Sequence, residues 1–195
     1  MKKELLVARP TVMRGIRRAS LALGLCAALC GVLAGSAPAQ AANLLMNPGF
    51  DVVGPIGPVT SFTGLGASPS AAAAWRVYHT AFGTTRTRLL PAPWGGGMIH
   101  VYTTSMGNGL LQAFMPYNQG PKVVKGAIRV LVVKGKIAIS TGNGPSALID
   151  ATNAGMGVWE VVSAPNGDAP ANTFRIRAVS IGGAEFYVDM AGVFD

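Results

Sequence analysis

The sequence predicts an all-β domain, a sandwich or barrel built from many short strands. Short segments with alternating apolar residues recur along the chain and are separated by Gly, Pro and Asn. After residue 42, no apolar repeat with the helical period of 3.6 residues runs far enough for a good helix. The length of 195 residues allows one domain, or one domain with an appendage. With 50% hydrophobic and 12% charged residues, the chain is not a charged disordered polymer.

The first 42 residues predict a cleaved secretory signal peptide. Residues 1–18 are basic, residues 19–35 are uncharged and apolar, and residues 36–42 offer two A-x-A cleavage sequences. We expect cleavage between Ala39 and Ala42. A retained membrane anchor is the alternative, but a spanning helix needs about 20 apolar residues, and this segment is shorter and diluted by glycine. The protein is therefore expected to be secreted, to the extracellular space or the periplasm, with no membrane span after cleavage.

The leader also indicates an export route and contains both cysteines. Arg17 and Arg18 before a weakly hydrophobic segment indicate twin-arginine export. Cys26 and Cys30 each follow a leucine, where a lipoprotein site requires a small residue. The mature chain then has no cysteine, so it has no disulfide, thiolate metal site or cysteine nucleophile.

The positive charge is concentrated in the same leader. Six of the 16 lysines and arginines, but one of the eight acids, precede Ala19, which leaves ten basic and seven acidic residues. A net charge of +3 without a basic run lacks the electrostatic footprint of a nucleic-acid-binding protein. We therefore expect no nucleic-acid partner.

The mature chain contains nine expected strands. They span residues 43–51, 75–80, 98–104, 109–115, 127–133, 136–141, 158–163, 173–179 and Ala184–Phe194. In the third of them, Ile99 and Val101 share one face while His100 and Tyr102 share the other. A tight hairpin is expected at Lys134-Gly135. Residues 54–74, rich in Gly, Pro, Ser and Ala, are expected to form a long surface loop.

An enzyme is hard to assemble from the mature chain. A glycosidase needs two carboxylates that face each other at roughly 5–9.5 Å. The acids Asp150, Glu160, Asp168 and Glu185 are dispersed and belong to no catalytic pattern. The chain has no G-x-S-x-G, H-E-x-x-H or phosphate-binding loop. We therefore expect a protein without enzymatic activity.

Four segments resemble the galactose-binding-like jelly rolls, which include carbohydrate-binding modules attached to xylanases and glucanases. The opening sequence NLLMNPGFD (43–51) is similar to the first strand of that family, and AEFYVD (184–189) is similar to its closing strand. GLLQAF (109–114) and GVWEV (157–161) resemble two internal strands. The resemblance implies a two-sheet antiparallel β-sandwich, a jelly roll, over residues 43–195 as a single domain.

The resemblance also implies a structural Ca²⁺ near the chain ends. Its side-chain ligands would be Asp51 and Asp189, helped by backbone carbonyls near Asn47 and Phe50. Ca²⁺ takes about six to eight hard oxygen ligands, several of which carbonyls can supply. Met190 stands where the family has a second polar residue. The alternative is that both aspartates are ordinary strand-end or turn residues.

Aromatic side chains are the expected sugar-binding groups, because flat rings stack on the apolar face of a sugar while polar groups bind its hydroxyls. The expected ligand-binding residues are Trp94, Tyr102, Gln112, Tyr117 and Tyr78. Trp94 lies in an irregular Pro/Gly-rich stretch, as an exposed loop residue or as a plug folded back on the domain. Tyr102, His100 and Gln112 are expected to share one face. Trp75 and Trp159 are expected in the core.

We therefore expect a secreted, non-catalytic carbohydrate-binding protein with a glycan as its partner. The alternative is a structural or adhesive protein of the cell envelope or matrix, with the same fold and no sugar site. The first requires exposed aromatics beside hydrogen-bonding groups on one surface. The second would instead present an apolar or edge-strand patch.

Overall fold

The computed structural model describes five stretches of the chain: residues 43–114, 124–142, 146–150, 158–164 and 173–194. The leader over residues 1–42, and with it the expected cleavage site, lies outside the described residues. The fold below is that of the unit Ala41–Asp195. Within the described stretches, no helix is long and apolar enough to cross a membrane.

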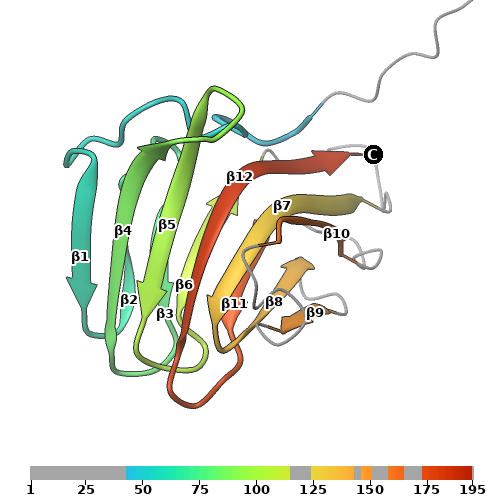
Figure 1. Ribbon diagram of the computed structural model, residues 1–195. Coiled ribbons are helices and arrows are strands. Elements are labelled where there is room, and N and C mark those ends of the chain that lie inside the picture. Colours follow the sequence, from blue (N-terminus) through green and yellow to red (C-terminus); the bar gives the residue numbers. More distant parts are fainter. Residues whose placement is uncertain (1–42, 115–123, 143–145, 151–157, 165–172, 195) are drawn as a thin grey trace, which may run out of the picture. The chain divides into compact units, whose positions relative to one another are not determined.

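The described residues form two antiparallel six-stranded sheets, which confirms the predicted all-β sandwich (Figure 1). The strands are β1 (Val59–Thr63), β2 (Gly66–Pro69), β3 (Arg76–His79), β4 (Thr84–Pro91), β5 (Gly97–Thr103), β6 (Gly109–Ala113), β7 (Lys125–Lys134), β8 (Lys136–Thr141), β9 (Ala147–Asp150), β10 (Glu160–Ser163), β11 (Thr173–Ala178) and β12 (Ala184–Phe194). The first sheet has the order β1-β4-β5-β12-β7-β10, and the second has the order β2-β3-β6-β11-β8-β9. The chain passes repeatedly from one sheet to the other, as in a jelly roll.

The core contains the inward-facing side chains of both sheets. Trp75, Phe174 and Phe186 are at most 1% exposed, and Phe50 packs on Trp75 with ring centroids 5.0 Å apart. The expectation that Trp75 is a core residue is thus confirmed. Fully burying one large apolar side chain stabilises a fold by about 1.5–3 kcal/mol, so this cluster supplies much of the driving force.

The hairpin expected at Lys134-Gly135 is wrong. Strand β7 pairs with β12 and β10 in the first sheet, whereas β8 pairs with β11 and β9 in the second. The tight turn therefore crosses between the sheets. Gly135 has φ of 77°, and a Cβ at this position would lie 2.4 Å from the carbonyl oxygen of Gly183, so the turn requires glycine. Two adjoining alternating segments look the same in sequence whether or not their strands pair.

The opening segment over residues 43–51 is not a strand, contrary to its expected conformation. Asn47 and Phe50 have positive φ, 48° and 55°, which breaks the extended backbone. The start of the segment is nevertheless attached to β12, because the amide of Leu44 donates to the carbonyl oxygen of Val193 at 2.8 Å.

Four strands were not expected: β1, β2, β4 and β9. The first two lie inside the stretch assigned to a long loop. The inward side chains of β1 and β4 include Thr60, Thr85 and Thr87, all of them buried. The hydroxyls of Thr60 and Thr87 hydrogen-bond each other at 2.7 Å. Because the buried face of this strand pair is largely hydroxylated, the hydrophobic alternation that identifies a strand is weak there.

Candidate functional site

The outer face of the first sheet carries a concentration of polar and aromatic side chains. In β5 the alternation is as expected: Ile99 and Val101 are fully buried, while His100 and Tyr102 point to the other side. Strands β4 and β12 flank β5, so their outward residues lie beside these two side chains. The register of the three strands fixes which residues are neighbours.

One row across this face joins Arg86, Tyr102 and Glu185. Tyr102 of β5 is the partner of Arg86 in β4 and of Glu185 in β12. Residues directly opposite in an antiparallel pair have Cβ atoms about 4.5–5.5 Å apart, so these side chains are in reach of one another. The row combines a guanidinium, a phenol and a carboxylate.

The next row joins Arg88, His100 and Tyr187. His100 is the partner of Arg88 in β4 and of Tyr187 in β12. The His100 and Tyr187 rings are stacked, with centroids 4.5 Å apart and an interplanar angle of 20°. His100 Nε2 also donates to Glu185 Oε1 at 3.0 Å, which ties the two rows together. Stacking and hydrogen bonding hold both rings in place.

These rows border a hollow in the sheet face with a volume of about 330 Å³. We call it the sheet-face hollow. Its lining residues are Val59, Arg86, Thr87, Arg88, His100, Tyr102 and Glu185. Binding sites combine an apolar surface with a few well-placed polar groups, and this hollow has that composition.

Trp94 lies in the loop between β4 and β5, as the sequence predicts, and is 47% exposed. Its indole Nε1 donates to Asp189 Oδ2 at 2.8 Å, and its ring meets Trp159 edge-on with centroids 5.1 Å apart. Trp159 is only half-buried, so the prediction that it lies in the core is wrong. Trp94 thus combines both expected descriptions: it is exposed, and it is held against the domain.

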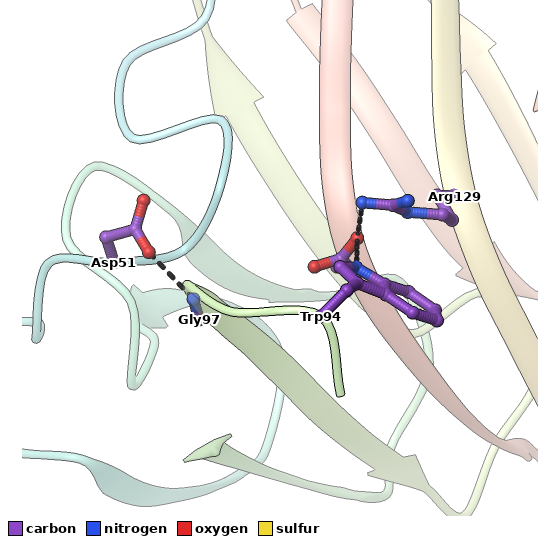
Figure 2. A network of polar contacts seen from close by, with 5 residues as sticks. Asp51, Trp94, Gly97 and Arg129 are labelled. Atoms are coloured by element: carbon purple, nitrogen blue, oxygen red, sulfur yellow. Dashed lines mark hydrogen bonds and ion pairs between the residues drawn. The ribbon is translucent and has the colours of Figure 1, made fainter. Parts of the chain in front are cut away.

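Asp189 has a cationic side chain beside it. Its side chain is 5% exposed and forms an ion pair with the guanidinium of Arg129, in addition to accepting the Trp94 hydrogen bond (Figure 2). Asp51 is exposed, and its Oδ1 accepts a hydrogen bond from the amide of Gly97 at 2.7 Å. Figure 2 shows Asp51 turned toward Gly97 rather than toward Arg129.

These contacts do not fit a cation held jointly by Asp51 and Asp189. A guanidinium already neutralises Asp189, and it would repel a calcium ion at the same carboxylate. The carbonyl oxygen of Asn47 accepts hydrogen bonds from Trp75 Nε1 and from the amide of Phe50, both at 3.2 Å. Among the described residues, no group of three or more His, Cys, Asp or Glu side chains could hold a metal ion. The calcium ion is thus an implication of the resemblance that these contacts do not support.

Gln112 does not share a face with Tyr102, so that expectation is wrong. Gln112 lies in β6 of the second sheet and is 1% exposed. Its side-chain amide binds the backbone of Met46 twice, accepting from the amide and donating to the carbonyl oxygen, each at 2.8 Å. Gln112 is thus placed to anchor the irregular opening segment.

Tyr78 is not among the residues that line the sheet-face hollow. Tyr78 lies in β3 of the second sheet, and its buried hydroxyl has no hydrogen-bond partner in the described part of the chain. Burial raises its pKa, against a smaller lowering by Arg177 and Arg175. Tyr117 lies outside the described residues.

The hollow contains residues that sequence reasoning did not select for binding. Arg86 and Arg88 alternate outward in Thr85-Arg-Thr-Arg-Leu89, a pattern typical of a solvated strand face or of an edge strand protected against aggregation. Glu185 lies in the closing strand and was considered only as an isolated acid. The missing information is strand order, since only pairing with β5 brings β4 and β12 together.

Comparison with known proteins adds a likeness of fold. No family model matches the chain, and no curated protein matches its sequence. The family 11 carbohydrate-binding module of the cellulosomal cellulase Lic26A-Cel5E of Clostridium thermocellum is 12% identical, with a TM-score of 0.47 over 80% of this chain and 96% of that one. The C-terminal family 6 module of a laminarinase from Zobellia galactanivorans is 16% identical, with a TM-score of 0.39 over 56% and 88%.

A third similar structure is a family 61 module in complex with β-1,4-galactotriose. It is 14% identical, with a TM-score of 0.36 over 78% of this chain and 98% of that one. All three proteins are carbohydrate-binding modules.

Proposed function

We propose that this protein binds carbohydrate, without catalysis, in the sheet-face hollow. The observation that carries the proposal is the arrangement of Tyr102, His100 and Glu185 in one hollow, with two arginines of β4 along one side of it. We further propose that it acts outside the cytoplasm after its leader is removed.

The chemistry of the hollow suits a polyhydroxylated ligand. A sugar presents ring hydroxyls, which need donors and acceptors, and a C–H face, which packs on apolar and aromatic surface. Tyr102 offers both a ring and a hydroxyl. The stacked rings of His100 and Tyr187 are already ordered, which lowers the entropy cost of binding. Trp94, at one end of the same sheet, is a second aromatic surface for a longer glycan.

The acid inventory of the hollow supports binding rather than hydrolysis. The common glycosidase mechanisms use a pair of carboxylates. Among the described residues that line the hollow, Glu185 is the single acid, and it is hydrogen-bonded to His100. This arrangement supports a site that holds a sugar without cleaving it.

The test is a glycan array, followed by pull-down on insoluble polysaccharides. Tyr102→Ala should lower the affinity for a bound glycan about tenfold or more, since stacking and a hydrogen bond are both lost. The control is Phe82→Ala, which removes a 77% exposed aromatic from the loop between β3 and β4. Melting curves should show that both variants are folded. Absence of binding to every glycan would exclude this function.

A second candidate, an adhesive envelope or matrix protein, is favoured by one observation. Four exposed apolar residues, Leu65, Phe82, Met106 and Ile181, lie on four loops at one end of the domain. The loops are joined by hydrogen bonds, such as Ser105 Oγ to the carbonyl oxygen of Phe82 at 2.7 Å and the amide of Gly107 to the carbonyl oxygen of Ala178 at 2.8 Å.

Apolar residues exposed together mark surfaces that contact a partner. If this end makes the functional contact, the double variant Phe82→Ser/Ile181→Ser should abolish self-association measured by analytical ultracentrifugation. A protein that is monomeric with and without these changes would exclude self-adhesion. Tyr102→Ala should leave such self-association unchanged.

A further inference from the structure

We infer that the sheet-face hollow is built for an acidic glycan, one that carries carboxylate or sulfate groups along its chain. This inference rests on the proposed carbohydrate binding and names the ligand class. The evidence is the uncompensated positive charge that β4 brings to the hollow.

Arg86 and Arg88 present two guanidiniums on one face of β4. Thr87 between them points into the core and is 1% exposed, whereas both arginines are exposed and line the hollow. Residues two apart in a strand are roughly 7 Å apart along the chain. Two cations at this spacing can bind two anionic groups of one polymer, or converge on one.

Neither arginine has an acid across from it. On the β1 side, Arg86 is the partner of Ser61 and Arg88 is the partner of Val59. On the β5 side, their partners are Tyr102 and His100. In the described stretches of the chain, neither guanidinium forms an ion pair.

The acid in the hollow does not cancel these charges. Glu185 lies in β12, on the far side of β5 from the arginines, and its Oε1 accepts a hydrogen bond from His100 Nε2. The hollow therefore has two guanidiniums but one carboxylate, and that carboxylate already has a hydrogen-bond partner. Arginine forks match the planar oxygens of a carboxylate, and likewise those of a sulfate, in bidentate geometry.

Edge protection does not explain the pair. Charged side chains on an edge strand prevent sheet-to-sheet aggregation, but β4 is an interior strand, paired with β1 on one side and β5 on the other. The arginines thus protect no edge, and they line a hollow in which an anionic ligand would pair with their charge.

The test compares polymers that differ in charge alone. The protein would be titrated with polygalacturonate and its uncharged methyl ester, and with dextran sulfate and dextran. We expect at least one charged member to bind about tenfold or more tightly than its neutral partner, with affinity falling as salt is raised. The carboxylated and sulfated pairs distinguish the two sources of anionic oxygen.

Charge removal then locates the effect. Arg86→Gln and Arg88→Gln should each lower the affinity for the charged polymer about tenfold, since a hydrogen bond to a charged group contributes about that much. Arg76→Gln removes the same charge from an exposed position of β3 in the second sheet and should leave affinity unchanged. Each hollow variant should lower the affinity for the uncharged polymers less than it lowers the affinity for the charged ones.

Three outcomes would overturn the inference. Equal affinity for charged and neutral partners, unaffected by Arg86→Gln and Arg88→Gln, would leave carbohydrate binding standing and remove the acidic specificity. Equally tight binding of poly-glutamate would show adsorption of any polyanion. Absence of binding to all four polysaccharides and to the array would remove the proposed function and this inference with it.

Discussion

The guanidinium of Arg129 lies over the indole ring of Trp94, with its central carbon 4.3 Å from the ring centroid. Both side chains also bind the carboxylate of Asp189, so a cation, a ring and an anion form one closed network (Figure 2). A cation–π contact of this kind contributes about 0.5–2 kcal/mol, depending on solvent exposure. The network attaches the loop between β4 and β5 to strands β7 and β12.

Removing the anion should therefore destabilise the domain. Asp189→Ala leaves Arg129 without its counter-ion and Trp94 without its acceptor, so we expect the free energy of unfolding to fall by about 2 kcal/mol or more. Urea denaturation measures this loss. In a double-mutant cycle with Arg129→Met, the second change should cost much less in the Asp189→Ala background than alone. If the two losses of unfolding free energy simply add in the double variant, the interaction between Asp189 and Arg129 contributes no stability.

The same network bears on the predicted calcium ion. Because Arg129 already neutralises Asp189, we expect a chelator to leave the melting temperature unchanged. Differential scanning calorimetry with EDTA, then with excess Ca²⁺, decides the point. A fall in melting temperature on chelation, restored by Ca²⁺ and absent in Asp51→Ala, would instead establish the ion and place it at Asp51.

Much of the fold was predictable because apolar alternation follows directly from burial. Where the buried face is apolar, as in β5 with Ile99 and Val101, both the strand and its faces were predicted. Where it is hydroxylated, as at Thr60 and Thr87, the alternation is weak and the strands were missed. The positive φ of Asn47 was missed as well; its side chain hydrogen-bonds the backbone of Val52 and of Ala73, in an irregular turn that apolar alternation does not reveal.

The site was less predictable, because it depends on strand order. Tyr102 was predicted, and it lies in the hollow. Its neighbours Arg86 and Glu185 come from segments about 100 residues apart, and only the pairing of β4, β5 and β12 unites them. The placement of Gln112 was wrong for the same reason, since its strand looks like an equivalent neighbour in sequence but belongs to the second sheet.

Variants of Gln112 and Tyr102 should affect different properties, the first stability and the second glycan binding. Gln112→Ala leaves the amide and carbonyl of Met46 without partners, so we expect the free energy of unfolding to fall by about 2–3 kcal/mol while glycan affinity is retained. Tyr102→Phe removes one hydroxyl from the hollow and should weaken glycan binding severalfold at unchanged stability. Urea denaturation and calorimetric titration of both variants test this. If the Gln112→Ala variant is folded but no longer binds glycan, Gln112 contributes to the ligand site as the sequence predicts.

Tyr78 should make the domain sensitive to alkali. Burial, partly offset by Arg177 and Arg175, holds the pKa of its hydroxyl above the ordinary value of about 10. Below that pH the hydroxyl is neutral in the folded and unfolded chains, and its contribution does not vary. As the pH rises above about 10, the unfolded chain releases the proton first, so stability falls until the pH passes the folded pKa.

Tyr78→Phe should remove this part of the alkaline loss. Since the buried hydroxyl has no hydrogen-bond partner in the described part of the chain, the variant should be at least as stable as the parent at neutral pH. Urea denaturation at pH 8 and at pH 11 measures both effects, with Tyr102→Phe as the control for loss of a hydroxyl from the other sheet. An equal alkaline loss in the parent and in Tyr78→Phe would show that Tyr78 ionises alike in the folded and unfolded chains.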